Sequence, residues 1–377
     1  MTSKSKKKLL ILGTLPPPVN GATIYFDTLL KTKVTRQFDI VFLDLKFADS
    51  IGDYGRFSLA KAGRFVGYAV RLCRILITSR IDLVYAAISF PPVSFVKDIF
   101  LVTICRLFGR RVVGCILGIG LENLYDHSGW FMKRFIKWGI SLYHSFTTPS
   151  LKMYDRYFSR LLPLEKAQAV PFGIFTDADV PNRNLIEASG SVRIIFYSNF
   201  VRSKGIDEAL EAIPLVTRKN PNVSFLFVGA WDSEVHKSAA MSIVESTGIG
   251  EHLKFLGVVT GDARKTCLQE SDIFLLPTYY PSEGLPLAIL EAMSYGCAII
   301  ATDHAATASA VEDGVNGFMC HPRDSRDLAI KINQLIEDRQ LLLGMQQNSL
   351  RKFRELFTAE RFGEKLAGEL LCLCNAR

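Results

Sequence analysis

The feature that most constrains this chain is a repeated alternation of short apolar runs with longer helix-like stretches. In the first half, strands are expected at 8–12, 40–45, 83–87, 111–117 and 145–148. The pattern restarts in the second half with expected strands at 192–198, 223–228, 253–256, 273–277, 298–301 and 317–319. Short buried strands that alternate with helices are typical of parallel α/β sheets, so the predicted fold class is α/β.

The length and one polar stretch together predict two domains. A chain of 377 residues is too long for one ordinary hydrophobic core. Residues 171–190 are polar and rich in turn formers, which indicates a linker. The expected architecture is two doubly wound, Rossmann-like domains, 1–170 and 191–355, that face each other across a cleft. Residues 356–377 are expected to form a C-terminal helix that can cross back to the first domain.

Charge is distributed unevenly between the two halves. Residues 1–180 carry 25 Lys and Arg against 13 Asp and Glu, whereas the remainder carries 20 against 24. The basic half therefore needs an anionic partner. We find no zinc finger, aromatic RNA motif or serially basic helix, so nucleic acid is excluded as that partner.

An anionic membrane surface fits the basic half better, because its basic residues alternate with large apolar ones. In the stretch 129–140, Phe131, Phe135 and Trp138 recur at helical spacing, and Leu142 continues the series. The bases Lys133, Arg134 and Lys137 stand between them, and 56–80 is a second basic and apolar stretch. Core-facing helices with a solvated basic face are the alternative, but the net charge favours peripheral membrane attachment.

The expected location is the cytoplasm, on the inner face of the plasma membrane. The basic N-terminus leads into an apolar run of only four residues, so a buried strand is favoured over a signal peptide. The longest candidate for a spanning helix, 85–108, is interrupted by prolines and charges. The eight cysteines show no C-x-x-C pair, which favours buried thiols in a reducing compartment.

The strongest chemical signal follows the expected strand 273–277. Pro286 suits a first helical turn, so the N–H groups of Leu287 and Ala288 are predicted to be free at a helix N-terminus, which suits a diphosphate. Glu283 precedes this helix and Glu291 lies within it. The pattern predicts a linear site with a carboxylate for sugar hydroxyls, amides for phosphates and a second carboxylate for a ribose. Two surface glutamates on an amphipathic helix are the alternative.

A second signal lies after the strand 192–198, where a loop carries Arg202 and Lys204 before Gly205. Two cations at a strand end can neutralise the charge that develops on a departing nucleoside diphosphate, in place of a metal ion. The alternative is an ordinary solvated loop.

Taken in order, these motifs resemble the retaining GT-B glycosyltransferases of family 4, the glycosyl transferases group 1 domain. The elements that carry the resemblance are Lys204-Gly205, Phe255-Leu256-Gly257, the strand ending in Pro277, the pair Glu283 and Glu291, and the turn from Asp313 to Gly317. In the first half the resemblance is weaker and rests on the segment from Pro17 to Gly21, which is similar to the family's glycine loop.

The resemblance implies roles for individual residues. Glu283 would contact the sugar hydroxyls and Glu291 the ribose, while Lys204 would hold the diphosphate. The remaining residues implied in donor binding are Gly21, Gly257, Val258, Gly284, Leu285, Leu287, Ala288 and Asn199. No metal ion and no cofactor are expected, because the nucleotide diphosphate sugar is a co-substrate.

The chain departs from the family pattern at three places. The arginine usual five residues before the lysine is Asn199, so Arg202 is the candidate replacement. The glycine–glycine–x–x–glutamate motif is replaced at 305–309. No histidine stands near 117–120, and His127 and His144 are interpreted as ordinary histidines. The pair Asp177 and Asp179 resembles a metal-binding DxD motif, but it lies in the expected linker.

The function expected is a retaining, metal-independent hexosyltransferase of bacterial polysaccharide or glycolipid assembly. It would use a nucleotide sugar and a lipid-linked or other saccharide acceptor, with the acceptor on the first domain and the donor on the second. Two alternatives stay open: a nucleotide-sugar 2-epimerase of similar fold, and a non-catalytic scaffold subunit.

Overall fold

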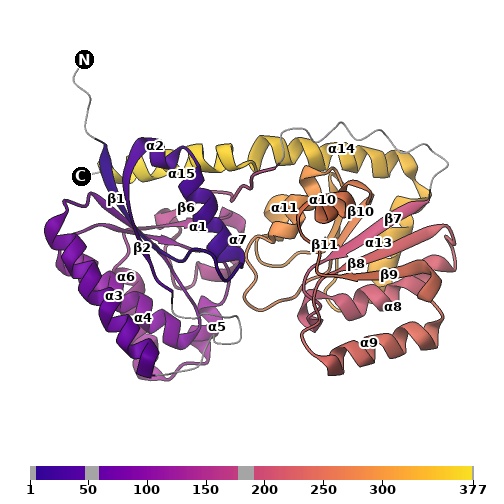
Figure 1. Ribbon diagram of the computed structural model, residues 1–377, viewed down its shortest axis with the longest axis horizontal. Coiled ribbons are helices and arrows are strands. Elements are labelled where there is room, and N and C mark those ends of the chain that lie inside the picture. The colour runs from indigo at the N-terminus through magenta and orange to yellow at the C-terminus, as the bar shows by residue number, and fades with distance from the viewer. Residues whose placement is uncertain (1–5, 47–58, 177–190, 376–377) are drawn as a thin grey trace, which may run out of the picture. The chain divides into compact units, whose positions relative to one another are not determined.

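The computed structural model describes residues 6–46, 59–176 and 191–375, with the side chains of 59–62 left aside. The chain forms two compact units (Figure 1). Unit 1 comprises Met1–Gly173 and Ala359–Arg377, and unit 2 comprises Ile174–Thr358. The expected linker lies mostly outside the described residues, as do Asp177 and Asp179.

Unit 1 is built on a six-stranded sheet in the order β2-β1-β3-β4-β5-β6, in which all the paired strands are parallel. Its core consists of the central strands, whose apolar residues are almost wholly buried, and of the helix faces that pack on them. The strands are β1 Lys7–Gly13, β2 Phe38–Asp44, β3 Leu83–Ala87, β4 Val112–Cys115, β5 Ser145–Thr148 and β6 Ala167–Ala169.

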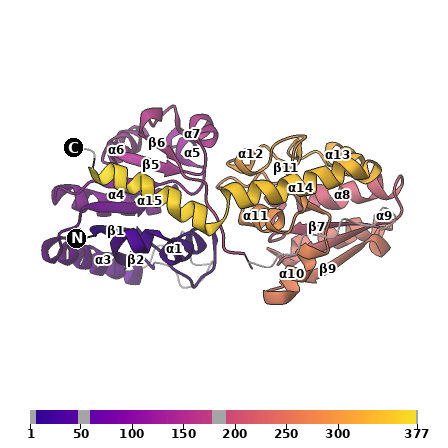
Figure 2. The same cartoon turned by 90° about the horizontal axis from the view of Figure 1, so that it is seen from above.

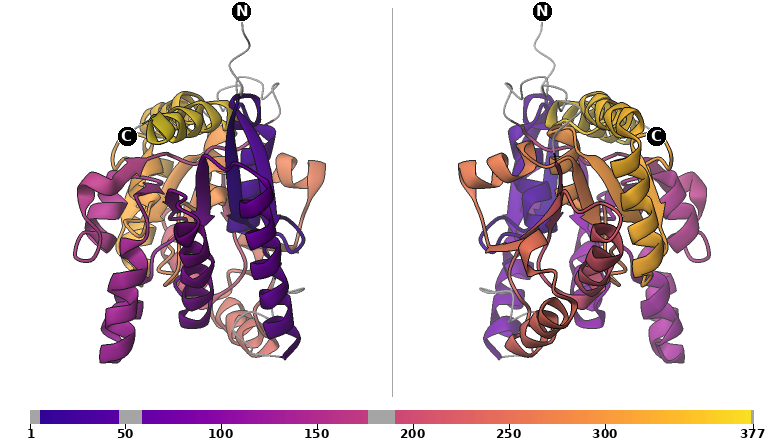
Figure 3. Two further views of the ribbon diagram at one scale, coloured as in Figure 1. Left: turned by 90° about the vertical axis from the view of Figure 1, so that its left-hand side faces the viewer. Right: turned by 90° about the vertical axis from the view of Figure 1, so that its right-hand side faces the viewer.

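Helices cover both faces of this sheet. The helices are α1 Gly21–Lys31, α2 Val34–Gln37, α3 Leu59–Thr78, α4 Pro92–Leu107, α5 Leu121–Asp126, α6 Trp130–Ser141, α7 Leu151–Phe158, α15 Ala359–Asn375 and the 3-10 turn η2 Leu164–Lys166. The left view of Figure 3 shows α3, α4 and α6 side by side beneath the sheet, with α15 above it.

The C-terminal helix α15 packs on α1 and α2, and Figure 2 shows it lying over unit 1. Phe362 of α15 makes an edge contact with Tyr25, with ring centroids 5.1 Å apart. A Cβ on Gly363 would lie only 2.4 Å from Thr32, so glycine permits this close approach. An ion pair between Lys33 and Glu364 closes the contact.

Unit 2 repeats the architecture with a parallel sheet in the order β12-β11-β10-β7-β8-β9. Its strands are β7 Val192–Tyr197, β8 Val223–Val228, β9 Leu253–Gly257, β10 Ile273–Leu276, β11 Ala298–Thr302 and β12 Gly317–Cys320. Its helices are α8 Ile206–Thr217, α9 Glu234–Thr247, α10 Gly261–Gln269, α11 Leu287–Ser294, α12 Thr307–Ala310, α13 Ser325–Glu337 and α14 Arg339–Leu356, with 3-10 turns η3 Arg202–Lys204 and η4 Gly250–His252.

These two doubly wound sheets confirm the α/β prediction, and all eleven expected strands are present with ends that agree within two residues. The strand that the sequence did not predict is β6, which has only three half-buried residues and no apolar run. Among the described helices, none is long and apolar enough to cross a bilayer.

The first prediction concerns Gly317, where β12 begins beside β11. A Cβ at this position would lie 1.9 Å from the carbonyl oxygen of Ile299, a rigid backbone atom. We expect Gly317→Ala to lower the free energy of unfolding by about 2–3 kcal/mol, which urea denaturation followed by circular dichroism can measure. Gly344→Ala is the control, because that site in α14 is open and alanine favours helix. Equal stability of the two variants would contradict the steric argument.

Candidate functional site

The candidate site lies at the carboxyl ends of two neighbouring strands of unit 2. Lys204 follows β7 through the turn η3, and Glu283 follows β10, which pairs directly with β7. The Nζ of Lys204 lies 2.5 Å from the Oε2 of Glu283, and both side chains are largely buried. Open α/β sheets bind ligands at this edge. The structure therefore brings together two residues that the sequence predicted to act.

Neighbouring groups fix this ion pair in place. The buried hydroxyl of Thr278 lies 3.0 Å from the same oxygen of Glu283 and donates to it. The hydroxyl of Thr302 donates to the backbone carbonyl of Thr278, which ties the segment to β11. The Nζ of Lys204 also lies 4.7 Å from the centre of the Tyr280 ring, a cation–π contact. The carboxylate is therefore oriented before any ligand arrives.

Gly205 explains why the lysine can reach this position. Its φ of 83° is left-handed, and a Cβ there would lie 2.5 Å from the carbonyl oxygen of Pro277. Only glycine allows the loop after β7 to pass so close to the end of β10. Steric fit therefore explains why a glycine follows Lys204.

The helix α11 begins beside Glu283 and presents an uncapped N-terminus. Its N-cap is Pro286, which makes no side-chain hydrogen bond, so the N–H groups of Leu287 and Ala288 have no cap. The loop before it is anchored, because the carbonyl of Gly284 accepts from the N–H of Ala306 at 3.2 Å. A helix start of this kind attracts anions. Leu285 is buried in the same loop.

Glu291 lies further along α11 in a different environment. Its Oε1 lies 3.3 Å from Nη1 of Arg264, while its Oε2 is buried and has no hydrogen-bond partner among the described residues. Burial raises the pKa of this carboxyl, and Arg264 partly offsets the effect. A buried carboxylate oxygen without a donor is costly, and a ligand hydroxyl would satisfy it.

Arg202 is not part of the Lys204–Glu283 cluster. Its side chain is 64% exposed, and its Nε lies 3.7 Å from the carboxylate of Asp207 in α8. Asp207 is also bound to the buried His236, at 2.8 Å from Nε2. The arginine is therefore held outward in this structure, although it stands on the same short turn as Lys204.

The remaining predicted donor residues lie at strand ends of unit 2 or in unit 1. Asn199 is exposed just after β7, and Gly257 ends β9 with a left-handed φ of 68°, followed by the exposed Val258. Gly21 belongs to unit 1, where it is the first residue of α1 behind the N-cap Asn20.

Three contributors were not predicted from the sequence: Thr278, Tyr280 and Arg264. The only available signal for Thr278 was its place directly after a buried strand. The histidines of unit 1 have the ordinary surroundings expected of them. His144 accepts from the Val112 N–H at 3.2 Å, and burial with nearby Arg106 lowers its pKa to about 4. His127 is exposed.

Comparison with known proteins gives one family match and several similar sequences and structures. Residues 182–352 match the family model described as glycosyl transferases group 1. The amylovoran biosynthesis glycosyltransferase AmsK of Erwinia amylovora is 26% identical over 44% of this chain and 41% of its own length. The N,N'-diacetylbacillosaminyl-diphospho-undecaprenol alpha-1,3-N-acetylgalactosaminyltransferase of Campylobacter jejuni is 29% identical over 42% of this chain and 40% of its own. The chain thus matches about two fifths of each relative.

The whole chain also resembles solved structures. HepE of Anabaena, crystallised in complex with UDP, aligns with a TM-score of 0.73 at 17% identity over 97% of this chain and 100% of that one. The sucrose-phosphate synthase of Thermosynechococcus elongatus aligns with a TM-score of 0.71 at 15% identity over 98% and 99%. The chain has the GT-B fold, as the sequence predicted.

The second prediction concerns the stability of the folded chain, which the buried carboxylate of Glu291 lowers. Because its folded pKa is raised, this carboxyl adds stability only while protonated at low pH, and that contribution is lost as the pH rises through the folded pKa. We expect Glu291→Gln to raise the Tm at pH 7.5 by roughly 2–4 °C, and less at pH 4. Glu245→Gln, on the exposed face of α9, should leave the Tm unchanged. A lower Tm for Glu291→Gln at both pH values would contradict this.

Proposed function

We propose that this chain, which carries a glycosyl transferases group 1 domain at residues 182–352, transfers a hexose from a nucleotide diphosphate sugar to a lipid-linked saccharide. The transfer would retain the anomeric configuration and need no metal ion. The observation that carries the proposal is the presence of three groups in unit 2: the Lys204–Glu283 pair, the uncapped start of α11, and the oxygen of Glu291 that has no partner among the described residues.

Along the chain, from Glu283 to Glu291, these groups would correspond to the successive parts of a nucleotide sugar. Glu283 would accept hydrogen bonds from the sugar, and Lys204 would bind the diphosphate together with the N–H groups of Leu287 and Ala288. Glu291 would take the ribose hydroxyls. On donor binding, Lys204 shares its charge between Glu283 and the phosphates, which neutralises the leaving group as a metal ion would. Arg202 can join it if its side chain leaves Asp207.

Retention follows if the acceptor attacks from the face on which the phosphate departs. The bond between the anomeric carbon and the phosphate oxygen breaks, and a bond from the acceptor oxygen to that carbon forms. The acceptor proton passes to the departing phosphate. This course needs no nucleophile from the protein, in keeping with a site whose carboxylates are already engaged with Lys204 and Arg264.

The relatives support both the donor and the acceptor class. HepE was crystallised with UDP-glucose as well as with UDP. The Campylobacter jejuni relative is named for a diphospho-undecaprenol acceptor, and another, from Mycolicibacterium smegmatis, is a phosphatidyl-myo-inositol mannosyltransferase. We extend these two classes to this chain and place it in the bacterial cytoplasm, peripherally on the inner face of the plasma membrane.

The helix α6 supports the membrane part of the proposal. Trp130, Phe131 and Trp138 are exposed on it. Phe135, which the sequence pattern grouped with them, is instead half-buried and faces Phe95, with ring centroids 6.3 Å apart. Exposed aromatic rings beside basic side chains suit the interface of an anionic bilayer.

The third prediction tests the transferase with Lys204→Ala. At saturating donor, turnover should fall by about tenfold to a thousandfold, because one group that stabilises the leaving diphosphate is lost. The measurement is the transfer of radiolabelled sugar from UDP-glucose and related donors to a lipid-linked acceptor fraction extracted from membranes. Lys219→Ala, an exposed lysine of the same unit, is the matched control.

The same assay tests metal independence. Adding a chelator should not lower the turnover of the wild type. Strict dependence on Mg²⁺ or Mn²⁺ would contradict the role given to Lys204 and would turn attention to Asp177 and Asp179. Interconversion of nucleotide sugars without any acceptor would indicate a 2-epimerase instead. Full activity of Lys204→Ala would remove this lysine from the diphosphate site.

The fourth prediction concerns α6. Replacing Lys133, Arg134 and Lys137 with glutamine should release much of the protein from anionic vesicles at low salt, since each basic residue near the surface contributes about 1 kcal/mol. Donor binding should not change, because the proposed donor residues of unit 2 are untouched. Co-sedimentation with anionic and neutral vesicles measures the effect. Equal binding to both kinds of vesicle would contradict it.

A further inference from the structure

The helix α3 exposes an apolar stripe. Val66, Val70 and Ile77 are between 60% and 71% exposed. At 3.6 residues per turn these three positions fall within about 40° of arc, so they form one face of the helix. An amphipathic helix of a folded unit normally buries such a face.

The neighbouring helix α4 repeats this arrangement. Val93, Phe100 and Leu107 are between 50% and 81% exposed and recur every seven residues, again within about 40°. The rings of Phe65 on α3 and Phe100 on α4 make an edge contact at 5.2 Å, so the two helices are packed side by side. Two adjacent exposed apolar stripes are more than scattered surface residues.

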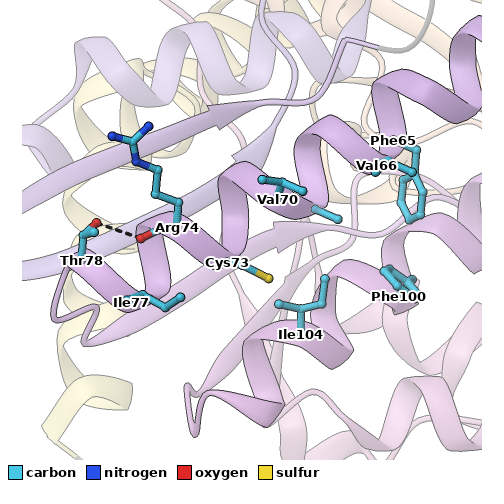
Figure 4. Close-up of a pocket in the computed structure, with 10 residues that line it drawn as sticks. Phe65, Val66, Val70, Cys73, Arg74, Ile77, Thr78, Phe100 and Ile104 are labelled. Atoms are coloured by element: carbon cyan, nitrogen blue, oxygen red, sulfur yellow. Dashed lines mark hydrogen bonds between the residues drawn. The ribbon is translucent and has the colours of Figure 1, made fainter.

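An open groove of about 620 Å³ lies where the two stripes meet. This volume falls within the usual range for sites that bind small molecules. Figure 4 shows Cys73 and Ile104 on opposite sides of the groove, while the guanidinium of Arg74 points away from it. The hydroxyl of Thr78 already donates to the carbonyl of Arg74 at 2.8 Å. The lining is otherwise apolar, so it suits a hydrocarbon and offers almost nothing to a polar ligand.

The net charges of the neighbouring helices indicate the kind of occupant. The helix α3 carries Lys61, Arg64, Arg71 and Arg74 and no acidic residue. The helix α6 packs against α4, since a Cβ on Gly139 would lie 2.8 Å from Ile99, and it too carries only basic charges. A second copy of this face would bring like charges together. An occupant with an apolar chain and an anionic head is complementary to it.

We propose that the α3–α4 groove binds one hydrocarbon chain of an anionic bilayer lipid, while the positive charge of α3 and α6 attracts the lipid headgroup. The inference rests on the membrane attachment proposed above and assigns a site to it. Attraction between exposed charges is screened by salt, whereas burial of a hydrocarbon chain is not. The groove therefore gives membrane binding a component that salt does not remove.

The fifth prediction tests the groove with cis-parinaric acid, a fluorescent single-chain carboxylate, added to the full-length protein below its micellar concentration. Saturable fluorescence enhancement is expected with the wild type. Val70→Glu should weaken this binding by at least roughly tenfold. A carboxylate in the apolar wall disfavours burial of the hydrocarbon chain, and it repels the carboxylate head of the probe. Ile77→Glu, at the C-terminal end of the stripe, should weaken binding in the same way. Val235→Glu, at a still more exposed valine of α9, is the control.

Binding to vesicles is the second test of the groove. In high salt, wild type and the α6 glutamine variant should keep a common residual binding to anionic vesicles, and Val70→Glu should lose it. The inference is overturned if parinaric acid does not bind, if the two groove variants bind it like Val235→Glu, or if all variants are released alike by salt. A wild type that dimerises while Val70→Glu stays monomeric would assign the groove to a contact between copies.

Sugar transfer to a water-soluble saccharide separates this inference from the proposed function. Val70→Glu should retain that activity, because the groove holds no proposed catalytic residue. Loss of parinaric acid binding with transfer intact would reject the groove alone. Binding of parinaric acid by a chain that transfers no sugar would reject the transferase and keep the groove.

Discussion

The largely buried ion pair between Lys204 and Glu283 is the interaction on which the candidate site depends. Removing two charges from water is costly, and only close mutual contact and further hydrogen bonds offset that cost. Here the Thr278 hydroxyl and the Tyr280 ring supply those contacts. Neither charge can be removed alone without stranding the other. The tight turn at Gly205 and the position of β10 beside β7 bring the two side chains together.

The second carboxylate shows the opposite balance. Glu291 keeps one oxygen on Arg264 and leaves the other buried without a donor among the described residues, so the folded chain bears an electrostatic cost at this point. Proteins keep such local conflicts at functional sites and offset them elsewhere. Glu283 and Glu291, eight positions apart, therefore have distinct properties. Lys204 neutralises the first, whereas one oxygen of the second can still accept a hydrogen bond.

Much of the fold was predictable because buried parallel strands need continuous apolar runs, which are visible in one dimension. The places of Lys204, Gly205 and Glu283 could be predicted because each follows an apolar run that marks a buried strand. Thr278 and Arg264 were not, since their partners are set by which strands lie side by side. The outward placement of Arg202 depends on Asp207, three-dimensional information that the loop sequence does not contain.

Apolar periodicity alone does not tell which helix face is covered. In α6 the pattern grouped Phe131 with Phe135, yet the first is exposed and the second packs toward Phe95. In α3 and α4 the same kind of periodicity remains uncovered among the described residues. Seven basic residues and no acid on α3 and α6 supply the missing argument, because an apolar groove beside cationic helices is satisfied by neither water nor a copy of itself. An anionic amphiphile satisfies both properties at once.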